Sequence, residues 1–156
     1  MSSFIETQHF SPSLSVPIAV ALLGSGVFVV VRVVTAGMPS YKLLVALLLM
    51  AVLVAFAALL VFYPMTTRVD GEMLSVRMPA LINRTIDLRN VAEADVEEFS
   101  PLGDYGGWGV RFARGGVLYN LRGDRAVTLR LKSGEKVSVG SQAPHELLRA
   151  IEAARS

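Results

Sequence analysis

The chain has 156 residues, of which 53% are hydrophobic and only 18% are charged, and its formal net charge is +2. A balance this close to neutral excludes the strongly basic surface that nucleic-acid-binding proteins use. The sequence contains no cysteine, which excludes disulfides and thiolate chemistry. Residues 1–62 carry only three formal charges, Glu6, Arg32 and Lys42, and the remaining 13 basic and 12 acidic residues all follow Tyr63. The chain therefore consists of an apolar N-terminal part and a polar C-terminal part.

The apolar part contains two segments, residues 16–34 and 43–62, each with the roughly 20 residues that a helix needs to cross a bilayer. Their only charge is Arg32, which lies near an end, where a long side chain can reach the lipid headgroups. The connector, residues 35–42, is short and contains Gly and Pro, which predicts a tight turn. We therefore expect an antiparallel transmembrane hairpin within residues 16–63, preceded by an N-terminal tail at residues 1–15.

The first apolar segment does not have the features of a cleaved signal peptide. Residues 1–15 contain no Lys or Arg, and the segment is longer than the apolar core of such a peptide. We expect the protein to be multi-pass, with both termini on one side of the membrane. Basic residues flank both ends of the hairpin almost equally, so they do not determine which side that is.

Small residues in the two segments predict close contact between the helices. Gly24, Ser25 and Gly26 lie in the first segment, and Ala51 and Ala55 lie in the second. Neither segment has an ionisable residue deep inside it, which argues against a transporter or a channel.

The polar part, residues 64–156, alternates apolar and polar residues with the period of two that is typical of strands. We predict seven short strands in a small antiparallel sandwich or barrel. Residues 91–99 are ambiguous. A C-terminal helix is expected at about residues 144–154, because apolar residues recur there at helical spacing. The predicted strands are residues 67–69, 73–78, 82–88, 108–112, 117–119, 126–131 and 136–139.

Several motifs in the polar part resemble those of bacterial membrane proteins with a pleckstrin-homology-like (PH-like) domain, which are largely uncharacterised. The motifs are residues 105–111, Tyr119-Asn120 and the entry into the last helix at residues 140–147. The resemblance covers about residues 65–154, and two preceding spans also fit that family. It implies a PH-like seven-stranded domain with one C-terminal helix, located at the cytoplasmic face of the plasma membrane, with both termini in the cytoplasm. It does not imply a particular function.

The stretch Gly106-Gly107-Trp108-Gly109 is the most distinctive in the chain and has two interpretations. In one, an exposed Trp108 anchors a binding loop, and Tyr105, Trp108 and Arg111 form a candidate interaction surface. In the other, which we favour, the glycines permit a bend that lets Trp108 pack into the core.

Lipid binding has a weaker basis in the sequence. Many PH domains bind phosphoinositides with basic residues around the first hairpin turn, whereas the corresponding turn here is Asp70-Gly71-Glu72. This acidic turn argues against inositide binding. The candidate lipid-facing residues are instead the arginines that follow the anchor, Arg68, Arg77 and Arg84.

No combination of residues predicts catalysis, a metal site or a cofactor. The two histidines, His9 and His145, are far apart in sequence, and the acidic residues within 93–98 fit a solvated strand. We expect a non-enzymatic, membrane-anchored interaction module that binds a protein partner or self-associates, and no nucleic acid. The alternative is a membrane-surface sensor that binds anionic lipid or envelope components.

Overall fold

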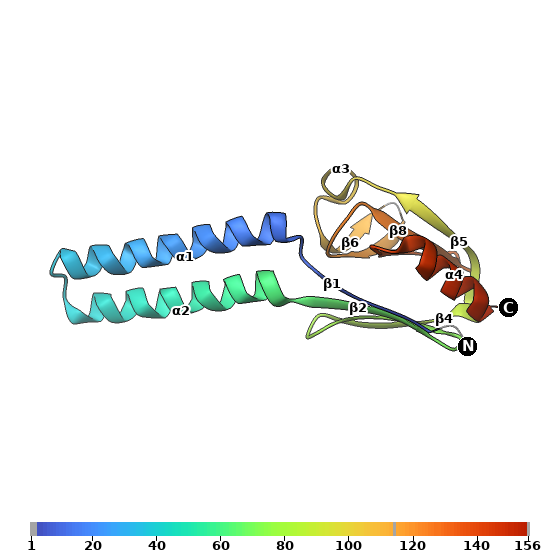
Figure 1. Cartoon of the computed structure of the whole chain (residues 1–156), viewed down its shortest axis with the longest axis horizontal. Helices are drawn as coiled ribbons and strands as arrows, with labels where there is room; N and C mark the ends of the chain where they lie inside the picture. Colours follow the sequence, from blue (N-terminus) through green and yellow to red (C-terminus); the bar gives the residue numbers. More distant parts are fainter. Residues whose placement is uncertain (1–2, 114, 156) are drawn as a thin grey trace. The chain divides into compact units, whose positions relative to one another are not determined.

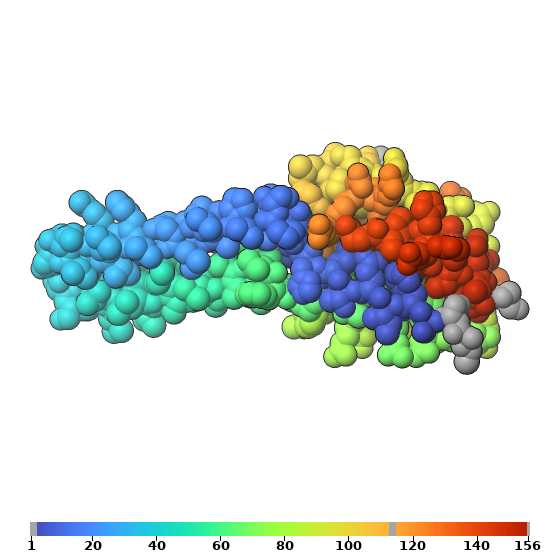
Figure 2. Space-filling model, viewed as in Figure 1, coloured from blue at the N-terminus to red at the C-terminus, as the bar shows by residue number. Residues whose placement is uncertain are grey.

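A computed structural model describes residues 3–113 and 115–155, and these residues form two compact units (Figure 1, and in space-filling form Figure 2). One unit, Phe10–Tyr63, is a pair of helices, called here the helical hairpin. The other unit, called the β domain, joins the residues up to His9 with those from Pro64 onward. The chain thus has two apolar N-terminal helices followed by a β-rich region with two sheets and a C-terminal helix, as the sequence predicts.

The helical hairpin consists of α1 (Pro12–Thr35) and α2 (Ser40–Phe62). Each helix begins three or four residues earlier than the apolar stretch predicts, because polar first turns are compatible with a helix and Pro is well tolerated at its start. Both helices are long and apolar enough to cross a membrane. Most of their large hydrophobic side chains are exposed, so neither helix has the one-sided apolar face of a helix that lies on a soluble core.

The two helices meet through small residues. Gly26 of α1 is buried, and so are Ala46 and Ala57 of α2, which lie three turns apart on the same side of the helix. The expectation that Gly24, Ala51 and Ala55 make this contact is wrong, since all three are exposed. With 3.6 residues per turn, positions 46 and 57 share a face, whereas Ala51 and Ala55 are directed away from it.

We expect Gly26→Leu to separate the helices and Gly24→Leu to leave them together. A Cβ atom added at Gly26 would overlap the Met50 sulfur and lie 3.2 Å from Leu53 Cδ1, whereas one added at Gly24 meets nothing within 4 Å. Thermal unfolding in mild detergent measures the difference, and Gly26→Leu should lower the midpoint by several degrees more than Gly24→Leu. Equal midpoints would show that this contact does not hold the hairpin together.

The β domain contains two sheets. The first sheet is an antiparallel meander in the order β1-β2-β3-β4, and the second has the order β5-β8-β9-β7-β6, antiparallel except for the parallel pair β7–β9. The strands of the first sheet are β1 (Phe4–His9), β2 (Pro64–Asp70), β3 (Met73–Met78) and β4 (Ile82–Asp87). Those of the second are β5 (Val91–Glu98), β6 (Gly109–Ala113), β7 (Gly116–Asn120), β8 (Arg125–Leu131) and β9 (Lys136–Gly140). The helical segments are η1 (Leu88–Asn90), α3 (Pro101–Tyr105) and α4 (Pro144–Arg155).

The described residues thus form nine strands, so the prediction of seven is wrong. The ambiguous segment is strand β5, and the expected N-terminal tail contains strand β1. The sequence of β1 gave no sign of a buried face, because two of its inward positions are the polar residues Glu6 and Gln8. Its pairing partner β2 lies more than 50 residues later, so no local turn signal marks the pair either.

Strand β1 is fixed to both sheets. It pairs along its whole length with β2, and His9 and Pro64 are Cα partners in the ladder. Gln8 is only 3% exposed, and its Nε2 donates a hydrogen bond of 2.7 Å to the carbonyl oxygen of Gly140 at the end of β9. The Glu6 carboxylate accepts hydrogen bonds from the Ser141 hydroxyl and the Gln142 backbone N–H. The β domain is therefore discontinuous, and the helical hairpin is inserted into its β1–β2 connection.

The core of the β domain lies between the sheets, where alternate residues of each strand point inward. Helix α4 contacts β2, β5 and β8 and adds Leu147 and Ile151 to this core, as its sequence spacing predicts. The fully buried side chains from the sheets include Met65, Val69, Leu74, Val76, Leu118, Val127, Leu129, Val137 and Val139.

Strand direction defines two ends of the β domain. The root end is where His9 and Pro64 connect to the hairpin, and it also carries the β3–β4 turn, the β5–β6 connection and the β7–β8 turn. The far end carries the β2–β3, β6–β7 and β8–β9 turns. The Gln8–Gly140 hydrogen bond joins the sheets toward the root end, and the Lys132 N–H donates to the Asn90 carbonyl over 2.8 Å at the far end.

Candidate functional site

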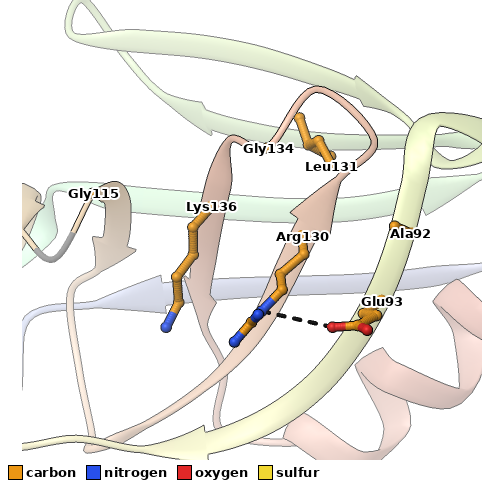
Figure 3. Close-up of a pocket in the computed structure, with 7 residues that line it drawn as sticks. All are labelled: Ala92, Glu93, Gly115, Arg130, Leu131, Gly134 and Lys136. Atoms are coloured by element: carbon orange, nitrogen blue, oxygen red, sulfur yellow. Dashed lines mark ion pairs between the residues drawn. The ribbon is translucent and has the colours of Figure 1, made fainter.

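A polar cleft of about 570 Å³ opens on the outer face of the second sheet at its far end (Figure 3). Arg130 and Lys136 are Cα partners on β8 and β9, and Figure 3 shows their charged ends extending the same way along neighbouring strands. Glu93 on β5 lies beside Arg130. The cleft is lined by Ala92, Glu93, Gly115, Arg130, Leu131, Gly134 and Lys136.

The two basic residues of the cleft, Arg130 and Lys136, form ion pairs that differ in length and burial. The Arg130–Glu93 contact is 3.7 Å long, and both side chains are well exposed, so it adds little to stability. Lys136 is more enclosed, and its Nζ lies 2.9 Å from the Glu97 carboxylate. That carboxylate also accepts a 3.0 Å hydrogen bond from Thr128, whose hydroxyl lies 2.9 Å from that of Ser138. Thr128 and Ser138 are both buried, so Glu97 completes a polar network rather than facing only solvent.

The pKa of Glu97 is lowered, mainly by the hydrogen bond from Lys136; burial opposes this effect, and the hydrogen bond from Thr128 adds a smaller lowering. A carboxyl with a depressed folded-state pKa stabilises the fold above the ordinary glutamate value of 4.5, and this stabilisation is lost as the pH falls through the lowered pKa. We expect Glu97→Gln to reduce the acid sensitivity of unfolding below about pH 5. Melting curves of the wild type and of Glu97→Gln at pH 7 and pH 4 measure this effect. If the melting temperature falls between pH 7 and pH 4 by the same amount in both proteins, the prediction is contradicted.

An apolar groove of about 470 Å³ lies next to the cleft and shares Gly115 with it. Phe112 of β6 forms one side, and its side chain is 82% exposed. Strand β6 pairs only with β7 among the described residues, so its other edge is open. The groove is lined by Phe112, Gly115, Gly116, Val117 and Glu135.

A cross-sheet ion pair borders this groove. Arg84 on β4 donates from Nη2 to both carboxylate oxygens of Glu135 at 2.8 Å, joining the first sheet to the β8–β9 turn. Its Nε is buried without a hydrogen-bond partner among the described residues. Burial raises the pKa of the neighbouring Tyr119 hydroxyl, an effect that the positive charge of Arg84 partly offsets. Arg84 is therefore a structural link at the groove.

The three arginines expected to face lipid do not share one surface. Arg68 and Arg77 lie on the outer face of the first sheet, where Arg68 pairs with Asp70 at 2.7 Å and Arg77 is exposed. Arg84 is on the opposite face of that sheet, because its strand position pairs with the inward-facing Val76. The sequence places all three near the anchor, but only strand register shows which way each one points.

The other candidate residues, Tyr105, Trp108 and Arg111, come from the connection at the root end and from the start of β6. The Tyr105 ring packs edge-on against Phe99 with centroids 5.6 Å apart. Trp108 is partly buried. Its exposure is therefore intermediate between the two interpretations of the sequence, an exposed anchor and a core residue. The exposed Arg111 reaches back toward Gly107, where an added Cβ would lie 3.2 Å from its Nη2. The structure thus places these three residues in one segment.

This local structure follows from its sequence. The Ser100 hydroxyl accepts a hydrogen bond from the Gly103 N–H, and the Asp104 carboxylate accepts one from the Ser100 N–H. The arrangement is similar to a capping box, with the acidic residue one position later than usual. Gly106 ends α3 in the left-handed conformation with φ of 68°.

Phe112 is the feature that sequence reasoning missed. Residues 108–112 are predicted to form a strand, but no signal in that strand singles out Phe112. Only the strand order, with β6 at the edge of its sheet, shows that nothing among the described residues covers it.

Among residues 3–113 and 115–155, no three His, Asp or Glu side chains are placed to hold a metal ion. No protein-family model matches the sequence, and no curated protein matches it. The functional assignment consequently depends on the geometry of the chain itself.

Proposed function

We propose that this protein is a non-enzymatic interaction module that the helical hairpin anchors in the membrane, and whose β domain binds a protein partner or a second copy of the chain. The observation that carries the proposal is the open edge of β6 with the exposed Phe112, at the far end from the two points of attachment to the hairpin.

Membrane anchoring is supported by the exposed apolar surface of both helices, since a helix in lipid satisfies its own backbone hydrogen bonds. It is also supported by strand pairing. Because His9 and Pro64 are adjacent in one ladder, both ends of the inserted hairpin start from the same place. We infer two crossings, with the termini and the β domain together on one side. The family resemblance suggests that this side is the cytoplasm.

A PH-like identity for the β domain is part of the proposal. Two packed sheets followed by a single C-terminal helix support it. The additional strands β1 and β5 exceed the seven-strand layout, and the parallel pair β7–β9 is a further departure from the antiparallel arrangement that the sequence predicts.

The far-end surface suits a protein that offers an extended segment. A strand added to β6 would satisfy its open backbone groups and could cover Phe112. Burying one Phe side chain from full exposure is worth about 1.5–3 kcal/mol, which makes Phe112 the energetic centre of such an interface. The cleft beside it supplies charged groups on Arg130 and Glu93 that would select a partner by complementary charge.

Photo-crosslinking in intact cells tests this proposal. A photoreactive phenylalanine analogue replaces Phe112 in the full-length chain, and a control variant carries it at the exposed Met73 on the outer face of the first sheet. We expect one discrete adduct from position 112 and none from position 73. An adduct with the mass of two chains identifies self-association, and a heavier or lighter one identifies a different protein. Absence of a discrete adduct at position 112 contradicts the proposal.

A further inference from the structure

The root end of the β domain carries an exposed apolar tip on its first sheet. Leu81 is 70% exposed at the β3–β4 turn, which a hydrogen bond from the Leu81 N–H to the Met78 carbonyl closes over 3.1 Å. Ala80 within this turn has a φ of 59°, a left-handed conformation that residues other than Gly rarely adopt. Leu81 therefore exposes most of an apolar side chain at the surface of the β domain.

Strand register places this turn level with the attachment to the hairpin. Thr66 pairs with Arg77, so Met78 lies beside Met65 and the turn extends past Pro64. Pro64 is bonded directly to Tyr63, where α2 has just ended. At about 3.3 Å per strand residue, Leu81 lies within a few residues' length of Pro64, the first residue of β2.

A second exposed apolar tip lies at the same end of the second sheet. Leu102 in α3 is 68% exposed. Helix α3 follows the end of β5, where Glu98 pairs with Arg125 at the start of β8, and the next residue of β8, Ala126, pairs with Gly140. Gly140 accepts the hydrogen bond from Gln8, so it lies at the root end of the β domain. Both apolar tips therefore belong to the end of the β domain that is tethered to the spans.

The charges near the two tips fit a position at lipid headgroups. Arg77 lies one residue before Met78 on the exposed face of β3, and the β7–β8 turn exposes both Arg122 and Asp124. The exposed Glu98 at the end of β5 forms an ion pair of 3.0 Å with Arg125. The acidic β2–β3 turn is at the far end of the first sheet. Asp104, the acidic residue nearest to Leu102, is engaged with the Ser100 N–H as a helix cap.

From this arrangement we infer that Leu81 and Leu102 insert into the interfacial layer of the same bilayer that the hairpin spans, so that the β domain rests on the membrane by its root end. The ligand is the lipid surface itself. The inference depends on the proposed membrane anchoring, but not on the proposed protein-binding role of Phe112.

Spin labelling of the full-length chain tests the inference, because the native sequence has no cysteine. Nitroxides are attached to Leu81→Cys, Leu102→Cys, Met73→Cys and Leu48→Cys in vesicles of phosphatidylcholine and phosphatidylglycerol. Met73 is an exposed control at the far end, and Leu48 is an exposed control within α2. The measured quantity is the ratio of collisions with oxygen, which partitions into lipid, to collisions with a water-soluble nickel chelate.

We expect this ratio at positions 81 and 102 to exceed that at position 73 severalfold and to approach that at position 48. If either position 81 or position 102 matches position 73 while position 48 is lipid-exposed, the inference is overturned and the anchoring proposal stands. If position 48 is also exposed to water, both fail. As a control, thermal unfolding of each labelled variant is measured. A midpoint equal to that of the wild type shows that the substitution leaves the fold intact.

Discussion

A fragment of residues 64–155 is expected to remain unfolded, whereas residues 3–9 joined to residue 64 through an Asn-Gly turn should fold as a domain without the hairpin. The fragment lacks β1, which pairs with all of β2. It also leaves the Gly140 carbonyl without the hydrogen bond from Gln8. An unsatisfied buried carbonyl alone costs about 1–3 kcal/mol, and a domain of this size has only about 5–15 kcal/mol of stability in total.

The joined variant is possible because His9 and Pro64 are Cα partners, so two turn residues can replace the inserted hairpin. Circular dichroism and thermal melting of the two proteins provide the comparison. A fragment of residues 64–155 that melts cooperatively at the same temperature as the joined variant would show that β1 is not an integral strand of the domain.

Gly140→Ala is expected to destabilise the β domain by about 1–3 kcal/mol, the usual cost of overpacking a core. The added Cβ atom would overlap the Asn120 side-chain oxygen. Asn120 has no room to move, because it is completely buried. Its amide also donates to the Gly123 carbonyl and accepts from the Arg122 N–H, each at 3.1 Å, which shapes the β7–β8 turn.

Chemical denaturation of the joined variant with and without Gly140→Ala measures this cost. Asn120→Ala serves as the second mutation of a double-mutant cycle. Once Asn120 is truncated, Gly140→Ala should cost clearly less than it does alone. Additive losses from the two substitutions would mean that the contact between these side chains is not the cause.

The two apolar helices were predictable from sequence because their signal is local. A run of about 20 apolar residues is long enough for a helix that crosses a bilayer. The contact face between the two helices was only partly predictable. Gly26 was identified correctly, but Ala51 and Ala55 were chosen for their size without regard to the helical face that Ala46 and Ala57 define.

Features that depend on long-range pairing could not be read from the sequence. β1 has inward polar residues whose long-range hydrogen-bond partners are Gly140, Ser141 and Gln142, which follow more than 130 residues later. The exposure of Phe112 depends on strand order, which alternation does not encode. Similarly, Glu97 was predicted to be solvated because its neighbours are acidic, whereas cross-strand contacts with Lys136 and Thr128 decide its environment.

The insertion of a membrane-spanning hairpin between β1 and β2 is the central claim, and cysteine topology tests it most directly. Three single variants, Ser3→Cys, Ser40→Cys and Ser133→Cys, place one thiol each beside β1, at the first residue of α2 and in the β8–β9 turn, all at exposed positions. A membrane-impermeant maleimide should label position 40 in intact cells and positions 3 and 133 only after lysis. Reaction of positions 3 and 133 from opposite sides, or of position 40 from the same side as both, would contradict the inserted hairpin.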